Sequence, residues 1–215
     1  MIILKKKYLL VFVTVVVVVP GHAAKYEVDT RGTLVQIHVS RAGPLKLFGH
    51  NHLISTNAIS GWLQYDVKDI TGSNFRLSIA ATALEVDNPE IRKQAGERYR
   101  SSVSQSARNG TRSNMLGPDV LNASRFPLIE VSGRWLQGKL HQPTVQASIS
   151  LHGVTRSLDA PVSLEPKGDR LVASGRLSIR QSDFGIKPFS AVGGTLAIAD
   201  NIDIDYRIIF DKTVK

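Results

Sequence analysis

The chain has 215 residues, with 27 lysine and arginine side chains against 18 aspartate and glutamate side chains, and no cysteine. This length is enough for one domain with a substantial core, and that core must hold the fold without disulfides. No basic stripe interleaved with aromatic residues accompanies the positive charge, which argues against nucleic acid as a partner.

The first segment, residues 1–23, is typical of a secretory signal peptide. Three lysines precede an apolar run from Tyr8 to Val19, and small residues lead to Ala23. The run has 12 residues, fewer than the roughly 20 that a spanning helix needs. We therefore expect a protein of the periplasm, or one otherwise secreted. Without the three lysines the mature chain carries 24 basic and 18 acidic side chains, which suits a transient contact with an anionic membrane surface.

From Lys25 onward, apolar and polar residues alternate in one segment after another, which is the pattern of half-buried strands. We expect about eight long antiparallel strands, and eight is the number at which a closed barrel can hold one small ligand. A two-sheet sandwich is the alternative. After a short opening segment, 26–30, the eight longer strand-like segments are 34–40, 59–67, 75–82, 129–136, 144–151, 156–164, 171–179 and 202–210.

One helical insertion, at about 89–121, interrupts the strands. Asn88 before Pro89 is a helix start signal, and the composition stays helical and mostly polar to about Arg108. Asn109-Gly110 is expected to end this helix, before a second short helical piece from Arg112 to Leu121. The insertion lies either across one mouth of the barrel or along its outer wall. If it covers the mouth, Arg108 and Arg112 are candidates for binding a phosphate head group.

The predicted inward faces combine aliphatic side chains with glycine and alanine, and no inward row is charged. We expect small residues such as Gly133, Ala147, Ala173 and Gly175 to leave an apolar cavity, although some glycines would serve instead as strand kinks. No motif of a hydrolase or phosphate-binding loop is present, so we expect no enzyme. The candidate ligand-binding residues of the interior and rim are Phe48, His50, His52, Leu63, Tyr65, Ile79, Ala81, Trp135, Ile149 and Phe184.

Two histidines lie one residue apart in the stretch from Leu47 to Ile54. On an extended chain, His50 and His52 would point to the same face. They would then form either a polar pair at the barrel rim or two ligands of a metal site, with His152 as a further weak candidate. A metal-binding or redox-linked protein is therefore the alternative function.

Five motifs in this order resemble the YceI-like family of exported, lipocalin-like barrels. They are Tyr26-Glu27-Val28-Asp29, Phe48-Gly49-His50-Asn51-His52, Phe126-Pro127-Leu128-Ile129-Glu130-Val131, Leu151-His152-Gly153-Val154-Thr155-Arg156 and Ser182-Asp183-Phe184-Gly185-Ile186. The resemblance covers about residues 25–211, and places the lipid-binding domain at 25–215. The segment 115–121, with its preceding arginine-rich helix, departs from the family pattern.

The resemblance implies a carrier or sensor of a polyisoprenoid or related long-chain lipid, with an isoprenoid quinone as one candidate ligand. It implies no other cofactor. The departure at 115–121 suggests a mouth of different size or charge. The sequence leaves open whether the protein forms a homodimer.

Overall fold

The computed structural model describes residues 23–139 and 141–213. The signal-peptide prediction therefore concerns a segment that lies, apart from its last residue, outside the described residues. Within the described part of the chain, no helix is both long and apolar enough to cross a membrane.

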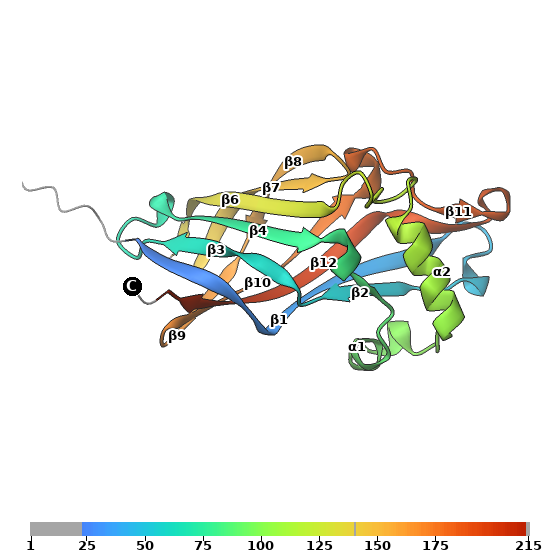
Figure 1. The fold of residues 1–215 in the computed structure, drawn as a ribbon, viewed down its shortest axis with the longest axis horizontal. Coiled ribbons are helices and arrows are strands. Elements are labelled where there is room, and N and C mark those ends of the chain that lie inside the picture. Colours follow the sequence, from blue (N-terminus) through green and yellow to red (C-terminus); the bar gives the residue numbers. More distant parts are fainter. Residues whose placement is uncertain (1–22, 140, 214–215) are drawn as a thin grey trace, which may run out of the picture.

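The molecule is built on one strongly curled antiparallel sheet (Figure 1). Nine of its strands follow the order β8-β7-β6-β4-β3-β1-β12-β10-β9, and three short strands pair beside this path. The strands are β1 (Ala24–Ala42), β2 (His52–Thr56), β3 (Ile59–Tyr65), β4 (Asn74–Ala80), β5 (Glu85–Val86), β6 (Leu128–Lys139), β7 (Gln142–Leu151), β8 (Val154–Pro161), β9 (Ser163–Lys167), β10 (Arg170–Arg180), β11 (Ser190–Ala191) and β12 (Leu196–Lys212).

The prediction of an all-β antiparallel barrel is confirmed, but the number of strands differs from eight. The expected strand 156–164 is divided between β8 and β9, which are the two edges of the sheet. Val162, between them, donates its backbone N–H to Pro143 O at 2.9 Å, and Leu164 donates to His141 O at 2.9 Å. These bonds join the start of β9 to the start of β7, so the sheet closes on itself at this end of the barrel.

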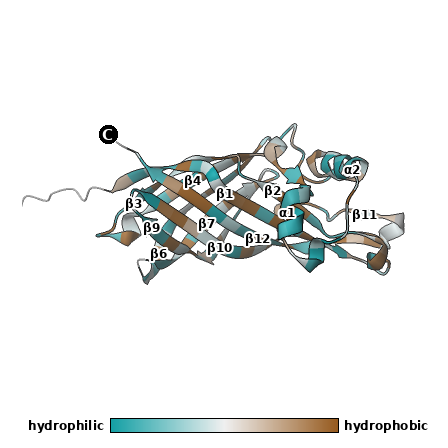
Figure 2. Cartoon of the chain, turned by 90° about the horizontal axis from the view of Figure 1, so that it is seen from below, coloured by the Kyte–Doolittle hydropathy of each residue, from teal (hydrophilic) through white to brown (hydrophobic). Residues whose placement is uncertain are grey.

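Alternation along the strands separates the interior from the surface, as Figure 2 shows in bands of hydrophobic and hydrophilic residues. On β12, Ile208 and Phe210 are buried, whereas Arg207 of the same strand is exposed. The two segments expected at 26–30 and 34–40 form one strand, β1, with a bulge between them. Gly32 has a φ of 79°, and the register of β1 against β12 shifts between Asp29 and Leu34. Bulges of this kind bend a long strand without ending it.

The insertion contains two separate helices, α1 (Pro89–Gln94) and α2 (Gln105–Leu116). As predicted, Asn88 caps α1, since its side chain accepts from the N–H groups of Glu90 and Ile91. The expected continuous helix to Arg108 is wrong, because Gly96, with a φ of 85°, follows the end of α1 at once.

The helix stop expected at Asn109-Gly110 is also wrong, because both residues lie inside α2. Ser104 starts this second helix by accepting from Ala107 N–H. An exposed glycine inside a helix costs only about 1 kcal/mol relative to alanine, so a well-capped helix continues through Gly110.

Replacing Gly61 with alanine is expected to destabilise the barrel by about 2–4 kcal/mol. Gly61 has a φ of 145°, and a Cβ there would lie 2.1 Å from Arg76 O of the neighbouring strand. Gly110→Ala is the matched control: a Cβ at this position would meet no atom within 4 Å, so the change should stabilise α2 by about 0.5–1 kcal/mol. Urea unfolding of both variants measures the two changes, and equal stability of Gly61→Ala and the wild type would contradict the expectation.

Candidate functional site: an apolar cavity with one histidine at its mouth

A cavity of about 320 Å³ lies inside the barrel. Its wall consists mostly of apolar side chains contributed by nearly all the long strands, and among its described lining residues there is no serine, cysteine, lysine or carboxylate. The lining of the cavity extends from Trp135 of β6, whose backbone N–H donates to Ser73 O, to Met115 of α2 and Phe189 before β11. A space of this size and polarity suits an apolar ligand.

Five of the residues that sequence reasoning selected line the cavity: His52, Leu63, Ile79, Trp135 and Ile149. Three others, Tyr65, Ala81 and Phe184, are buried in the surrounding core without lining it. Phe48 and His50 lie outside the cavity, with Phe48 79% exposed. Sequence reasoning did not select Met115, Phe189 or Tyr206, which also line the cavity.

Small inward residues were expected to leave room for a cavity. Of the four named, the two alanines lie in the cavity wall, and the two glycines do not. Ala147 and Ala173 line the cavity. At Gly133 a Cβ would lie 2.6 Å from the Phe75 ring, and at Gly175 it would lie 2.5 Å from the Tyr206 hydroxyl. The space beside each glycine is therefore filled by an aromatic side chain.

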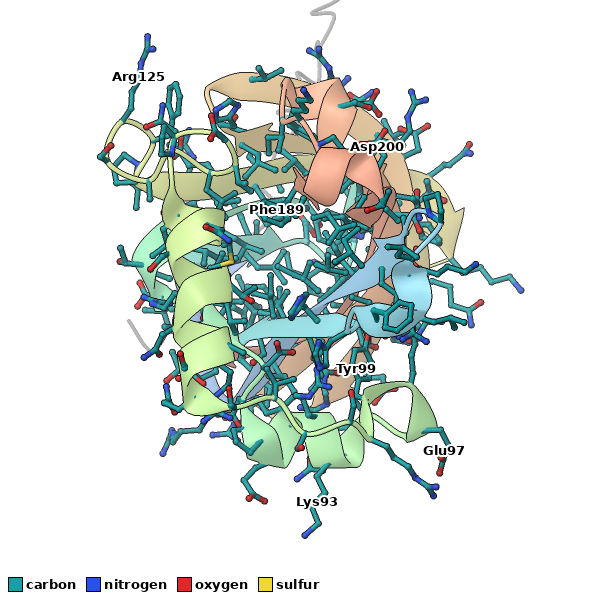
Figure 3. The ribbon with its side chains drawn as sticks, turned by 90° about the vertical axis from the view of Figure 1, so that its right-hand side faces the viewer. Lys93, Glu97, Tyr99, Arg125, Phe189 and Asp200 are labelled. Carbon is teal, nitrogen blue, oxygen red and sulfur yellow. The ribbon has the colours of Figure 1, made fainter. Side chains whose placement is uncertain are left out.

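The helix α2 lies across one end of the barrel, which we call the mouth (Figure 3). Thr111, Asn114 and Met115 of α2 line the cavity, and Met115 packs into the core. Figure 3, which looks at this end, also places Phe189 beside α2 near the middle of the opening. The insertion thus covers the mouth with α2, while α1 packs beside β2 (Figure 1).

At the mouth, His52 is held by a buried carboxylate. Its Nδ1 lies 2.6 Å from Asp87 Oδ2, and Asp87 Oδ1 accepts from Leu53 N–H at 2.9 Å and from Arg92 Nη1 at 2.5 Å. Asp87 is 0% exposed and Arg92 is 5% exposed. Among the described residues, Asp87 alone hydrogen-bonds the His52 ring, which leaves Nε2 of this cavity-lining side chain available to a ligand.

Two opposing effects set the charge of Asp87. Burial raises the pKa of its carboxyl, but the hydrogen bonds from His52 and Leu53, together with electrostatic attraction to His52 and Arg92, lower the pKa below its usual value. Arg92 also donates to Asn51 O and Ser101 O, both at 2.9 Å. Together these hydrogen bonds join β2 to the segment that carries α1. Sequence reasoning did not select Asp87.

A second polar network joins the same segment to β1 and β12. The Tyr99 hydroxyl lies 2.7 Å from His38 Nδ1, and His38 Nε2 lies 3.0 Å from Asp205 Oδ2. Tyr99 is 3% exposed, and burial raises its pKa. The hydrogen bonds from Tyr99 to His38 and from His38 to Asp205 thus attach the insertion to the barrel wall.

In the cavity wall, burial also raises the pKa of the Tyr206 phenol, to about 12.

The two arginines expected at the head group bind backbone carbonyls of the protein. Arg108 Nη1 donates to Val103 O at 2.8 Å, and Arg112 donates to Leu84 O and Thr82 O. Both arginines are half-buried. Their hydrogen bonds brace α2 against its own N-terminal end and against the residues before β5, so the structure gives each a role in positioning the helix.

The three histidines of the metal hypothesis are not brought together. His50 precedes β2, so the alternation of a strand does not apply to it, and its ring centroid lies 6.5 Å from that of His52. The His152 ring contacts the Phe126 ring, and His152 Nδ1 lies 3.3 Å from Phe184 O. Within the described ranges, no three histidine, cysteine, aspartate or glutamate side chains form a group that could hold a metal ion.

The YceI-like domain model matches residues 26–210, which is most of the chain. The chain belongs to the YceI-like domain family. Its fold is that of solved structures with low sequence identity. Burkholderia cenocepacia BcnA is 14% identical with a TM-score of 0.63, and the match covers 85% of this chain and 98% of BcnA.

Two further solved structures resemble this YceI-like barrel. A polyisoprenoid binding domain from Saccharophagus degradans, implicated in plant cell wall breakdown, is 12% identical with a TM-score of 0.59, and the match covers 89% of this chain and 99% of that one. The Campylobacter jejuni YCEI protein is 11% identical with a TM-score of 0.56, over 75% and 85% of the two chains. No curated protein matches the sequence.

Replacing Asp87 with asparagine is expected to destabilise the protein by about 3 kcal/mol at neutral pH, because Arg92 would lose its buried counter-charge. The folded-state pKa of Asp87 is depressed. Its contribution is therefore complete above the unfolded pKa of about 3.9 and is lost as pH falls through the folded value.

The stability difference between wild type and Asp87→Asn should accordingly shrink below about pH 4. Denaturant unfolding at a series of pH values measures it. Asp119→Asn, at an exposed position, is the control and should leave stability unchanged. A difference that stays constant down to low pH would show that the carboxylate charge is not what stabilises the site.

Proposed function

We propose that this YceI-like protein is an exported carrier or sensor that holds a long-chain isoprenoid lipid in its barrel. The observation that carries the proposal is the apolar cavity that extends from Trp135 to the mouth. The family match and the polyisoprenoid binding domain among the similar structures support the choice of an isoprenoid. Burial of an apolar chain contributes roughly 25 cal/mol per Å², so a long tail binds without polar contacts.

In the proposed complex the tail lies inward and the head group lies at the mouth beside His52. Because Asp87 accepts from Nδ1, Nε2 of a neutral His52 accepts a hydrogen bond from a hydroxyl head group, such as that of a polyprenol. A protonated His52 would instead donate to a phosphate or a quinone carbonyl oxygen. An isoprenoid quinone is therefore one candidate ligand, alongside polyprenols.

The cavity chemistry favours binding over catalysis. The described lining residues include one imidazole, two carboxamides, one threonine and one tyrosine, but no nucleophilic serine or cysteine and no carboxylate. Nucleophilic catalysis needs such a group beside a base. We therefore propose that the bound lipid leaves the protein unchanged. The periplasm, or another compartment reached by export, is the proposed location.

Extraction of the purified, exported protein with organic solvent, followed by mass spectrometry, should release an isoprenoid lipid. Ala173→Phe should reduce the amount released at least several-fold, because Ala173 lines the cavity and a phenyl ring there would occupy ligand space. Ser178→Phe, at an exposed position of the same strand, is the control and should release as much lipid as the wild type. Equal loading of both variants, at equal folding by circular dichroism, would contradict a ligand inside the barrel.

Replacing His52 with phenylalanine should weaken polyprenol binding about tenfold, which corresponds to the loss of one hydrogen bond of about 1.4 kcal/mol. A hydrocarbon of similar length without a hydroxyl should bind wild type and variant about equally. Titration monitored by tryptophan fluorescence, to which Trp135 in the cavity wall contributes, measures both affinities. An equal loss for the two ligands would assign His52 to the structure of the mouth and remove it from head-group binding.

A further inference from the structure

Large apolar side chains are exposed around the mouth. Leu45, Leu47 and Phe48, in and beside the short helix η1 (Lys46–Phe48), are 41%, 76% and 79% exposed. Phe189, before β11, is 42% exposed. We call these four residues the mouth tip. Of the other described residues, only Val67 and Leu128 are large, apolar and comparably exposed, and Val67 lies at the opposite end of the barrel (Figure 1).

Hydrogen bonds within and between its two segments hold the mouth tip in place. Leu45 donates its N–H to Thr195 O at 2.9 Å, and Arg41 Nη1 donates to Gly49 O at 2.9 Å. The approach to Thr195 needs a glycine at position 43, where φ is 86° and a Cβ would lie 2.6 Å from Thr195 O. Figure 1 shows η1, in light blue, and β11 at the same end as α2. The exposed apolar side chains are thus held in place by an ordered backbone.

Phe189 connects the mouth tip to the cavity, since it lines the cavity while remaining partly exposed. The Phe189 carbonyl accepts from Ile198 N–H at 3.0 Å, and this bond attaches Phe189 to the first residues of β12. An apolar path therefore runs from the outer surface of the mouth into the barrel. A lipid entering the cavity would pass these side chains.

The segments that form the mouth carry a net positive charge. Three segments form this end of the molecule, 41–51, 97–119 and 183–200, and together they contain seven basic and four acidic residues. The acidic residues are Glu97, Asp119, Asp183 and Asp200, of which Glu97 pairs with Arg100 and Asp183 pairs with Arg180 of β10. The seven basic residues are Arg41, Lys46, Arg98, Arg100, Arg108, Arg112 and Lys187. Such a surface attracts an anionic partner.

We propose that the mouth docks on the surface of an anionic lipid bilayer, with Leu47 and Phe48 inserted among the head groups, so that the ligand passes directly between bilayer and cavity. The exposed apolar side chains contribute buried apolar area, and the basic side chains beside them contribute electrostatic attraction to anionic lipids. Surface binding to a membrane depends on these two contributions and is reversible. The transfer step rests on the proposed carrier function. An acidic protein surface would match the charges, but it would not account for an apolar tip continuous with a lipid-sized cavity.

Sedimentation with vesicles of equal parts phosphatidylcholine and phosphatidylglycerol tests the docking. The wild type should bind these vesicles, bind pure phosphatidylcholine vesicles more weakly, and bind less as salt rises. Leu47→Ser with Phe48→Ser should lower binding at least tenfold, and Val67→Ser is the control at the opposite end. Lys46→Gln with Lys187→Gln should abolish most of the preference for phosphatidylglycerol, whereas Lys68→Gln with Lys139→Gln should not.

Binding that is unchanged in the Leu47→Ser, Phe48→Ser variant, or lost equally in the Val67→Ser variant, would overturn the docking. Capture of an acidic poly-glutamate peptide as strongly as the charged vesicles, without need of the apolar pair, would assign the mouth to a protein partner and also overturn it. Lipid loading is measured separately by solvent extraction. If the protein retains lipid but does not bind vesicles, the docking proposal alone is contradicted. If it binds vesicles but retains no lipid, the carrier function is contradicted.

Discussion

The buried carboxylate of Asp87 connects the parts of the molecule that make a cavity with a defined mouth. It accepts from the His52 ring, the Leu53 backbone and the Arg92 guanidinium. The first two partners belong to β2 in the barrel wall, and the third belongs to α1 in the insertion. A fully buried charge is costly unless it is paired and hydrogen-bonded. The three partners surround the carboxylate only when the insertion packs on the barrel. The position of the insertion and the orientation of the His52 ring therefore depend on each other.

The interior of the barrel is mostly apolar, although the Trp135 Nε1 in the cavity wall and the Tyr65 hydroxyl in the core are buried without a hydrogen-bond partner among the described residues. Gln181 donates to Ala199 O, and the raised pKa of Tyr206 keeps its phenol neutral. The aromatic rings of Phe75 and Tyr206 pack against Gly133 and Gly175, where a larger residue would displace them. The remaining space is bounded by aliphatic side chains and by Ala147 and Ala173. Selectivity between head groups must therefore arise at the mouth.

The barrel could be predicted from the sequence because each strand shows its own alternation of apolar and polar residues. Alternation along β12 or β3 identifies the inward residues whatever their partners are, and so Leu63, Ile79 and Ile149 were found in the cavity wall. The glycines were misjudged because the space beside Gly133 is filled from a neighbouring strand, by Phe75, and no pattern within one strand records this.

The site at the mouth could be predicted only in part. His52 was selected from its neighbourhood with His50, but its actual partner, Asp87, lies 35 positions away in the sequence. The roles of Arg108 and Arg112 depend on backbone carbonyls, among them those of the segment before β5, which composition cannot reveal. The division of the insertion into α1 and α2 follows from Gly96 and Ser104, two local signals that the polar composition of the whole segment obscured.

Solution NMR of the methyl groups tests most directly that an isoprenoid chain occupies the barrel. On titration with a polyprenol, the methyl resonances of Ala147, Ala173 and Ile149, which line the cavity, should shift together and saturate at one ligand per protein. The methyl of Thr155, exposed on the outer surface, should not move. Shifts confined to exposed methyl groups, or cavity methyl resonances that stay unchanged at saturating ligand, would contradict a lipid held inside the barrel.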